Sequence, residues 1–144
     1  LLDTSPPCCA PCPPLLTTKL ADPTTEEGKR WLLSRSPITR VAAIERPLLI
    51  GQGANDPRVK QLESDQIVAA MKDKGIPVTY VLYPDEGHGF VRPENRKSFN
   101  AVAEVFLAEC LGGRYQPLGE DLAGSSIQVP AGKENIPGLA AELP

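Results

Sequence analysis

The chain has 144 residues, of which 41% are hydrophobic and 23% charged, a size and composition that fit one globular domain. Its formal net charge of −3 provides no basic surface for nucleic acid, so we expect no nucleic-acid partner. No apolar run approaches the roughly 20 residues of a membrane-spanning helix, and the chain opens with no signal-peptide pattern, so we expect no membrane partner.

The first 21 residues are rich in proline and cysteine. Because proline fixes φ and has no backbone N–H, we expect an irregular lead-in over residues 1–21. Cys9 and Cys12 have the spacing of a redox motif, but no strand and helix flank them. Together with Cys8 and the distant Cys110, they give only weak support for zinc, so we predict no metal and no cofactor. Cys110 is interpreted as a core residue of the last helix.

A helix is predicted to begin at Asp22 and Pro23 and to run to about Ser34, since a capping side chain, a proline and two acids stand in order. We expect Trp31 and Leu32 to be among its buried positions. Proline at position 37 ends the helix, because the residue before a proline avoids the α region.

Two short apolar runs, at 48–51 and 77–83, are predicted to be buried strands of a parallel sheet. A helical pattern between them, with Gly75 as its stop, joins them by a right-handed crossover. A further helix follows the second strand and is closed by glycines 112 and 113. The apolar positions of these two helices are Val59, Leu62, Ile67, Ala70 and Met71, and then Phe99, Val102, Ala103, Phe106, Leu107, Cys110 and Leu111.

The fold class is therefore α/β, with strand, helix, strand and helix in that order over residues 22–113. Residues 114–144 show no period and many glycines and prolines, so we expect an irregular tail with, at most, a short strand at 126–129.

An acid and a base follow the ends of the two predicted strands. Asp56 comes just after the first strand, and His88, the only histidine in the chain, comes just after the second. The carboxyl ends of parallel strands meet at one edge of the sheet, so we expect these two side chains to lie close together. An imidazole oriented by a carboxylate is the base that activates a serine nucleophile, and the order acid then histidine is that of the α/β-hydrolases.

The sequences around these residues, Arg-Pro-Leu-Leu-Ile-Gly-Gln-Gly-Ala-Asn-Asp-Pro-Arg-Val at 46–59 and Tyr-Pro-Asp-Glu-Gly-His-Gly-Phe-Val-Arg-Pro-Glu-Asn-Arg at 83–96, resemble the C-terminal end of the prolyl oligopeptidase family of serine peptidases. The resemblance covers roughly residues 22–113. It implies the last strands and helices of an α/β-hydrolase fold, with Asp56 and His88 as catalytic acid and base. It also implies a peptide substrate in a complete protein that adds the preceding part of the hydrolase domain and a β-propeller.

The nucleophile of such a site sits in a Gly-x-Ser-x-Gly elbow, and no serine of this chain lies in that motif. A cysteine among the first 12 residues is a poor substitute, because prolines break the strand it would need. Asp85 and Glu86 are rivals to Asp56 for the acid role, and we interpret them as solvated loop charges. The prediction is a piece that carries acid and base, has no nucleophile and is inactive alone.

Two other functions stay open from the sequence. An esterase or dienelactone-hydrolase-like enzyme would share the acid and histidine turns, and a non-catalytic hydrolase-like binding module would keep the fold without the reaction. For the chain by itself we expect low stability, because two parallel strands with one crossover leave sheet edges and helix faces uncovered.

Overall fold

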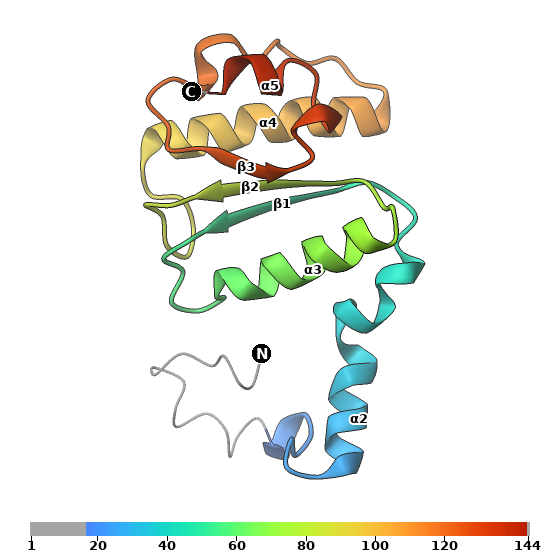
Figure 1. Cartoon of the computed structure of the whole chain (residues 1–144). Helices are drawn as coiled ribbons and strands as arrows, with labels where there is room; N and C mark the ends of the chain where they lie inside the picture. The colour runs from blue at the N-terminus through green and yellow to red at the C-terminus, as the bar shows by residue number, and fades with distance from the viewer. Residues whose placement is uncertain (1–16, 144) are drawn as a thin grey trace.

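A three-stranded sheet in the order β1-β2-β3 lies at the centre of the computed structural model, which describes residues 17–143 (Figure 1). Strands β1 and β2 are parallel, and β2 and β3 are antiparallel. The elements in chain order are α2 (Glu26–Arg35), η2 (Pro37–Ala43), β1 (Leu48–Gly53), α3 (Gln61–Asp73), β2 (Val78–Tyr83), α4 (Pro93–Leu111), η3 (Gly119–Leu122), β3 (Gln128–Ala131), η4 (Lys133–Asn135) and α5 (Leu139–Glu142).

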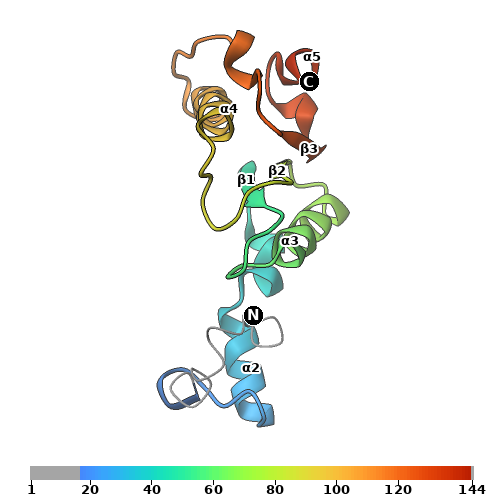
Figure 2. The ribbon, with the colours of Figure 1, turned by 90° about the vertical axis from the view of Figure 1, so that its left-hand side faces the viewer.

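Helices α3 and α4 cover opposite faces of the sheet, as the two views in Figures 1 and 2 show. Every residue of β2 is buried. Because successive side chains of a strand point to opposite faces of the sheet, alternate residues of β2 enter two different hydrophobic clusters. Val78, Tyr80 and Leu82 pack with Val68 and Met71 of α3. The intervening Val81 and Tyr83 pack with Val102 and Val105 of α4 and with the C-terminal segment. The predicted parallel crossover is therefore confirmed.

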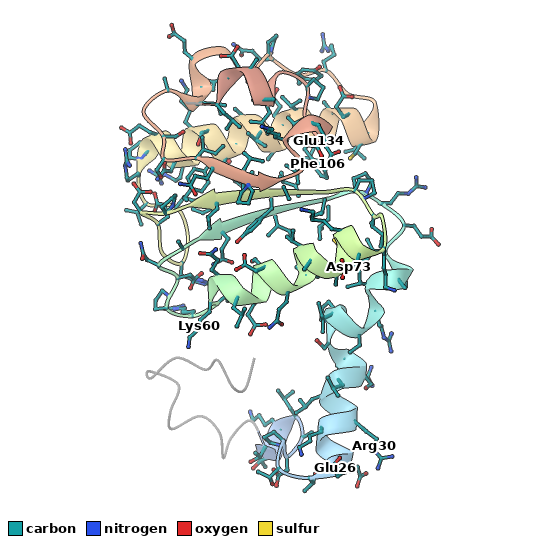
Figure 3. All side chains as sticks on the ribbon, viewed as in Figure 1. Glu26, Arg30, Lys60, Asp73, Phe106 and Glu134 are labelled. Carbon is teal, nitrogen blue, oxygen red and sulfur yellow. The ribbon has the colours of Figure 1, made fainter. Side chains whose placement is uncertain are left out.

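Helix α2 starts later and buries less than the sequence predicts. Its N-cap is Thr25, whose hydroxyl accepts the Gly28 N–H at 3.0 Å, whereas the Asp22 carboxylate is occupied by Thr24 in the preceding turn. Trp31 is 39% exposed, so the expectation of a buried Trp31 is wrong. The reason is visible in Figure 3, where the labelled Glu26 and Arg30 lie on a helix that extends away from the sheet.

The buried stripes of the other two helices also differ from the predicted ones. Val59, which precedes α3, and Leu62, in the first turn of α3, are exposed. Figure 3 labels Lys60 and Asp73 at the two ends of this helix. On α4, Leu107, Cys110 and Leu111 are exposed, so Cys110 is not a core residue. The buried face of α4 begins instead with two polar side chains and continues with apolar ones. Its members are Asn95, Ser98, Val102, Val105 and Ala108.

The segment after Gly113 is more ordered than expected. It forms β3 beside β2, close to the short strand predicted at 126–129, and adds two 3-10 turns and a helical turn. Its apolar side chains complete the cluster that packs against α4, so residues 114–143 are part of the fold rather than an irregular tail. The buried members are Leu118, Leu122, Ile127, Ile136 and Leu139.

The expected lead-in lies mostly outside the described residues, and so do Cys8, Cys9 and Cys12; within it, residues 17–19 are helical. No helix in the range 17–143 is both long and apolar enough to cross a membrane.

Candidate active site

Asp56 lies in the loop after β1, and this loop forms hydrogen bonds with one of its two carboxylate oxygens. Asp56 Oδ1 accepts the backbone N–H groups of Arg58 at 2.8 Å and Val59 at 2.9 Å. This aspartate turn is a local consequence of an Asp followed by proline at the end of a strand. The carboxylate is thereby fixed in direction, and Oδ2 remains for a partner from another loop.

That partner is His88. Its Nδ1 lies 2.9 Å from Asp56 Oδ2, so the structure brings together the acid and the histidine that the sequence placed after neighbouring strands. The Asp56 side chain is 8% exposed and the His88 side chain 49% exposed. Burial raises the pKa of Asp56. The N–H groups of Val59 and Arg58 and the His88 ring lower that pKa by a larger amount, so the net shift is downward. Asp56 is therefore a carboxylate at neutral pH, as a partner that orients an imidazole must be.

Backbone hydrogen bonds join the two loops directly. The Ala54 N–H donates to the Tyr83 carbonyl at 3.0 Å, and the Asn55 N–H donates to the Glu86 carbonyl at 2.9 Å. The Asn55 side-chain amide adds a bond to the Pro84 carbonyl at 2.7 Å. The parallel register of β1 and β2 thus continues beyond the strand ends, which sets acid and base side by side.

Glu86 is not a solvated loop charge, contrary to the sequence interpretation. Its side chain is buried, with the residue 2% exposed, and it accepts hydrogen bonds from the backbone N–H groups of Val91 at 2.8 Å and Arg92 at 2.9 Å. The Asn95 side-chain amide donates a third bond at 2.8 Å. Sequence reasoning considered Glu86 only as a rival acid, and it missed Asn95. The available signal for Asn95 was its helical spacing, four residues before Phe99 and seven before Val102 of the predicted apolar stripe.

Asp85 keeps the exposed position that the sequence predicts, but it is not without partners. It accepts from the Ser126 hydroxyl and pairs with the Arg92 guanidinium, and these two groups lower the pKa of Asp85 to about 2. Arg92 also donates to the Gly124 carbonyl at 2.9 Å, and the Ser126 N–H donates to Asn95 Oδ1 at 2.9 Å. The C-terminal segment is therefore bonded to the loop that carries His88.

A second buried polar side chain, Gln52, supports the acid loop. Its amide nitrogen donates to the carbonyls of Gly53 at 2.9 Å and Val59 at 3.0 Å, and its amide oxygen accepts the Ser64 hydroxyl at 2.6 Å. Sequence reasoning missed Gln52 too, since it lies within an otherwise apolar run.

The pocket beside the acid–histidine pair is lined by Gly51, Gln52, Gly53, Asp56, Val59, Ser64, Gly87, His88, Gly89 and Phe90.

Within the described residues, no group of three or more histidine, cysteine, aspartate or glutamate side chains is placed to hold a metal ion. The chemistry that the arrangement offers is proton transfer. With Nδ1 committed to a carboxylate, Nε2 is the ring nitrogen left to accept a proton from a nucleophile.

Comparison with known proteins identifies the family of the chain. The family model described as the prolyl oligopeptidase family matches residues 15–114. The chain is 64% identical over 143 residues to dipeptidyl aminopeptidase BIII of Pseudoxanthomonas mexicana, covering 99% of this chain and 21% of that protein. It is 56% identical over 97 residues to dipeptidyl peptidase family member 6 of Caenorhabditis elegans, covering 67% of this chain and 13% of that protein.

A solved structure of a puromycin-hydrolysing peptidase from Mycobacterium tuberculosis superposes with a TM-score of 0.62 at 26% identity, over 67% of this chain and 15% of that chain. The chain thus spans about a fifth or less of the relatives that it matches, and its fold is a part of the α/β-hydrolase fold. The match over 100 residues, from 15 to 114, shows that this chain belongs to the prolyl oligopeptidase family.

Proposed function

We propose that the chain is the C-terminal portion of a serine peptidase's catalytic domain and supplies the acid, Asp56, and the base, His88, of a Ser-Asp-His system. The observation that carries the proposal is the 2.9 Å contact between His88 Nδ1 and Asp56 Oδ2. In the reaction, the His88 Nε2 takes the proton of a serine hydroxyl as that oxygen attacks a peptide carbonyl, and later gives it to the leaving amine. Asp56 holds the ring in the required tautomer and stabilises the imidazolium.

The substrate class follows from the family and from the relatives, which are named as peptidases. This favours a peptide bond over an ester bond. The chain covers 21% and 13% of these two relatives, which supports a longer complete protein. The preceding part of the hydrolase domain and a β-propeller are proposed as its other parts on the family resemblance alone. The acid and histidine turns alone are common to esterases, so the preference for peptides rests on the relatives.

The nucleophile has to come from outside these 144 residues, and the chain alone is therefore inactive. Among the described serines, Ser64 is the one that lines the same pocket, but its hydroxyl donates to Gln52 Oε1 at 2.6 Å. Ser64 also lies within α3 and not at a strand-to-helix turn. Without a positioned nucleophile nearly all catalysis by such a constellation is lost.

A segment replacement tests the proposal. This chain replaces the matching stretch of the Pseudoxanthomonas enzyme, to which it is 64% identical, and hydrolysis of dipeptidyl substrates is measured. The chimera is expected to be active, and Asp56→Asn within it is expected to lower kcat/KM by roughly 10⁴-fold. His88→Ala is expected to lower it at least as much, whereas Glu104→Gln, an exposed change on α4, serves as the matched control.

The chain alone is exposed to a fluorophosphonate probe in parallel, and no serine is expected to react. A folded chimera that keeps its activity with His88→Ala contradicts the assignment of the base. Labelling of the isolated chain that disappears with Ser64→Ala contradicts the claim that the nucleophile comes from elsewhere.

A further inference from the structure

Glu86 is a buried acidic side chain that forms no ion pair within residues 17–143. The residue is 2% exposed, and its carboxylate oxygens accept three hydrogen bonds, from the N–H groups of Val91 and Arg92 and from the amide of Asn95. A buried carboxylate is costly unless such bonds compensate its lost hydration. Burial pushes the pKa of Glu86 up, but the three donors lower it further, so the group is ionised at neutral pH.

These bonds close a loop around His88. Glu86 precedes the histidine by two residues, and its partners Val91 and Arg92 follow it by three and four. Between them stand Gly87 and Gly89, which give the backbone no side-chain restraint, and Gly89 has φ +93°. The Glu86 carboxylate thus links the two ends of the segment that carries His88 by hydrogen bonds.

The main chain of the same residue meets the acid loop. The Glu86 carbonyl accepts the N–H of Asn55, the residue next to Asp56, at 2.9 Å. Glu86 therefore touches both halves of the pair: its carboxylate restrains the histidine loop, and its carbonyl is bonded to the aspartate loop.

We propose that Glu86 is a positioning residue that holds the His88 imidazole against Asp56 by closing the 86–92 loop. The inference rests on the proposed function for its catalytic meaning, but the contact that it concerns is present in the chain itself. Its consequence is a single neutral tautomer of His88, with the proton on Nδ1 directed to Asp56 and the lone pair on Nε2 free for the nucleophile.

A purely structural role is the competing explanation. Arg92 is the N-cap of α4 and Val91 precedes it, so the bonds to Glu86 also hold the start of that helix, where N–H groups lack helical partners. A cap that only stabilised α4 would change the free energy of unfolding and leave the tautomer of His88 in the folded state unaltered. The tautomer is therefore the measurement that separates the two roles.

The experiment is imidazole ¹⁵N and ¹H NMR on the full 144-residue chain, prepared without a histidine tag, at a pH at which the ring is neutral. Because the chain has one histidine, the ring signals need no assignment. The wild type is expected to show the Nδ1–H tautomer with a slowly exchanging Nδ1 proton. Glu86→Ala, and to a smaller extent Glu86→Gln, are expected to give both tautomers and to lose that proton signal. Glu94→Gln removes an exposed acid from the first turn of α4 and is expected to match the wild type.

Each result decides the question. A folded Glu86→Ala chain that keeps the wild-type tautomer and proton signal overturns the positioning role and leaves the proposed function intact. A wild type that already shows mixed tautomers instead contradicts the Asp56–His88 pair, and with it the proposed function. If both Glu86 variants unfold while Glu94→Gln stays folded, Glu86 belongs to the fold alone and the positioning role is overturned.

Discussion

Gly53, the last residue of β1, packs directly against the carbonyl of Gly87 in the histidine loop. A Cβ added at Gly53 would lie 2.3 Å from Gly87 O and 2.6 Å from Glu86 O, far inside contact distance. The acid and histidine loops approach this closely only because position 53 has no side chain. Close backbone approach is thus a condition for the contact between Asp56 and His88.

Gly53→Ala is therefore expected to separate the two loops and to destabilise the chain by about 1–3 kcal/mol, the usual cost of overpacking. Urea unfolding and the His88 Nδ1 proton signal measure the two effects. Gly113→Ala is the matched control, because a Cβ there meets Ala108 at an ordinary 3.6 Å. Equal stability of the two variants would contradict this account of Gly53.

Gln52 is expected to stabilise the acid loop through its bonds to the Gly53 and Val59 carbonyls. Gln52→Leu leaves these acceptors and the Ser64 hydroxyl without their partner, and such losses typically cost about 1–3 kcal/mol. Gln66→Leu, the same substitution at an exposed position of α3, is expected to change stability by less than about 0.5 kcal/mol. Chemical denaturation of both variants checks the difference, and a neutral Gln52→Leu would refute it.

Much of this fold is predictable from the sequence, because β1 and β2 are short apolar runs and α3 and α4 have apolar residues at helical spacing followed by a glycine. The same regularity predicts that Asp56 and His88 follow neighbouring parallel strands. Glu86 is different, because a charge beside a turn is usually solvated. Only the fold brings Val91, Arg92 and Asn95 around its carboxylate, and no local pattern encodes that enclosure.

The C-terminal segment escapes sequence prediction for a related reason. Its buried apolar residues are separated by turns and follow no helix or strand period, so the sequence predicts an irregular tail. Their burial depends on the cluster under α4, which forms only when β2 and α4 are in place. Long-range packing, rather than local propensity, orders this segment.

Leu122→Ala is therefore expected to cost about 2–5 kcal/mol of unfolding free energy, as for a core leucine, because Leu122 is 1% exposed within the main cluster. Leu111→Ala, at a leucine that is 79% exposed on α4, is expected to change stability by less than about 0.5 kcal/mol. Thermal and urea unfolding of the two variants provide the comparison. Similar small effects at both positions would mean that the segment does not contribute to the core.

Acid is expected to destabilise the chain through three carboxylates: that of Asp56 and two in the loop that carries His88. The pKa values of Asp56, Asp85 and Glu86 are all lowered in the folded state, that of Asp85 to about 2. In the unfolded chain, aspartate and glutamate titrate near their ordinary values of about 3.9 and 4.3. The folded state therefore binds fewer protons, so this stabilisation is complete above about pH 5 and is lost as pH falls through the folded-state values.

Unfolding free energies measured between pH 7 and pH 2 check this sign. Glu86→Gln removes one of the three groups, so its stability is expected to fall less steeply in acid, and its curve should approach that of the wild type at low pH. Glu94→Gln, whose side chain is exposed and makes only a 3.8 Å ion pair with Arg92, keeps all three groups and should follow the wild-type slope. Parallel curves for the wild type and Glu86→Gln would show that the Glu86 carboxylate has no coupling between folding and proton binding, against the enclosure seen in the structure.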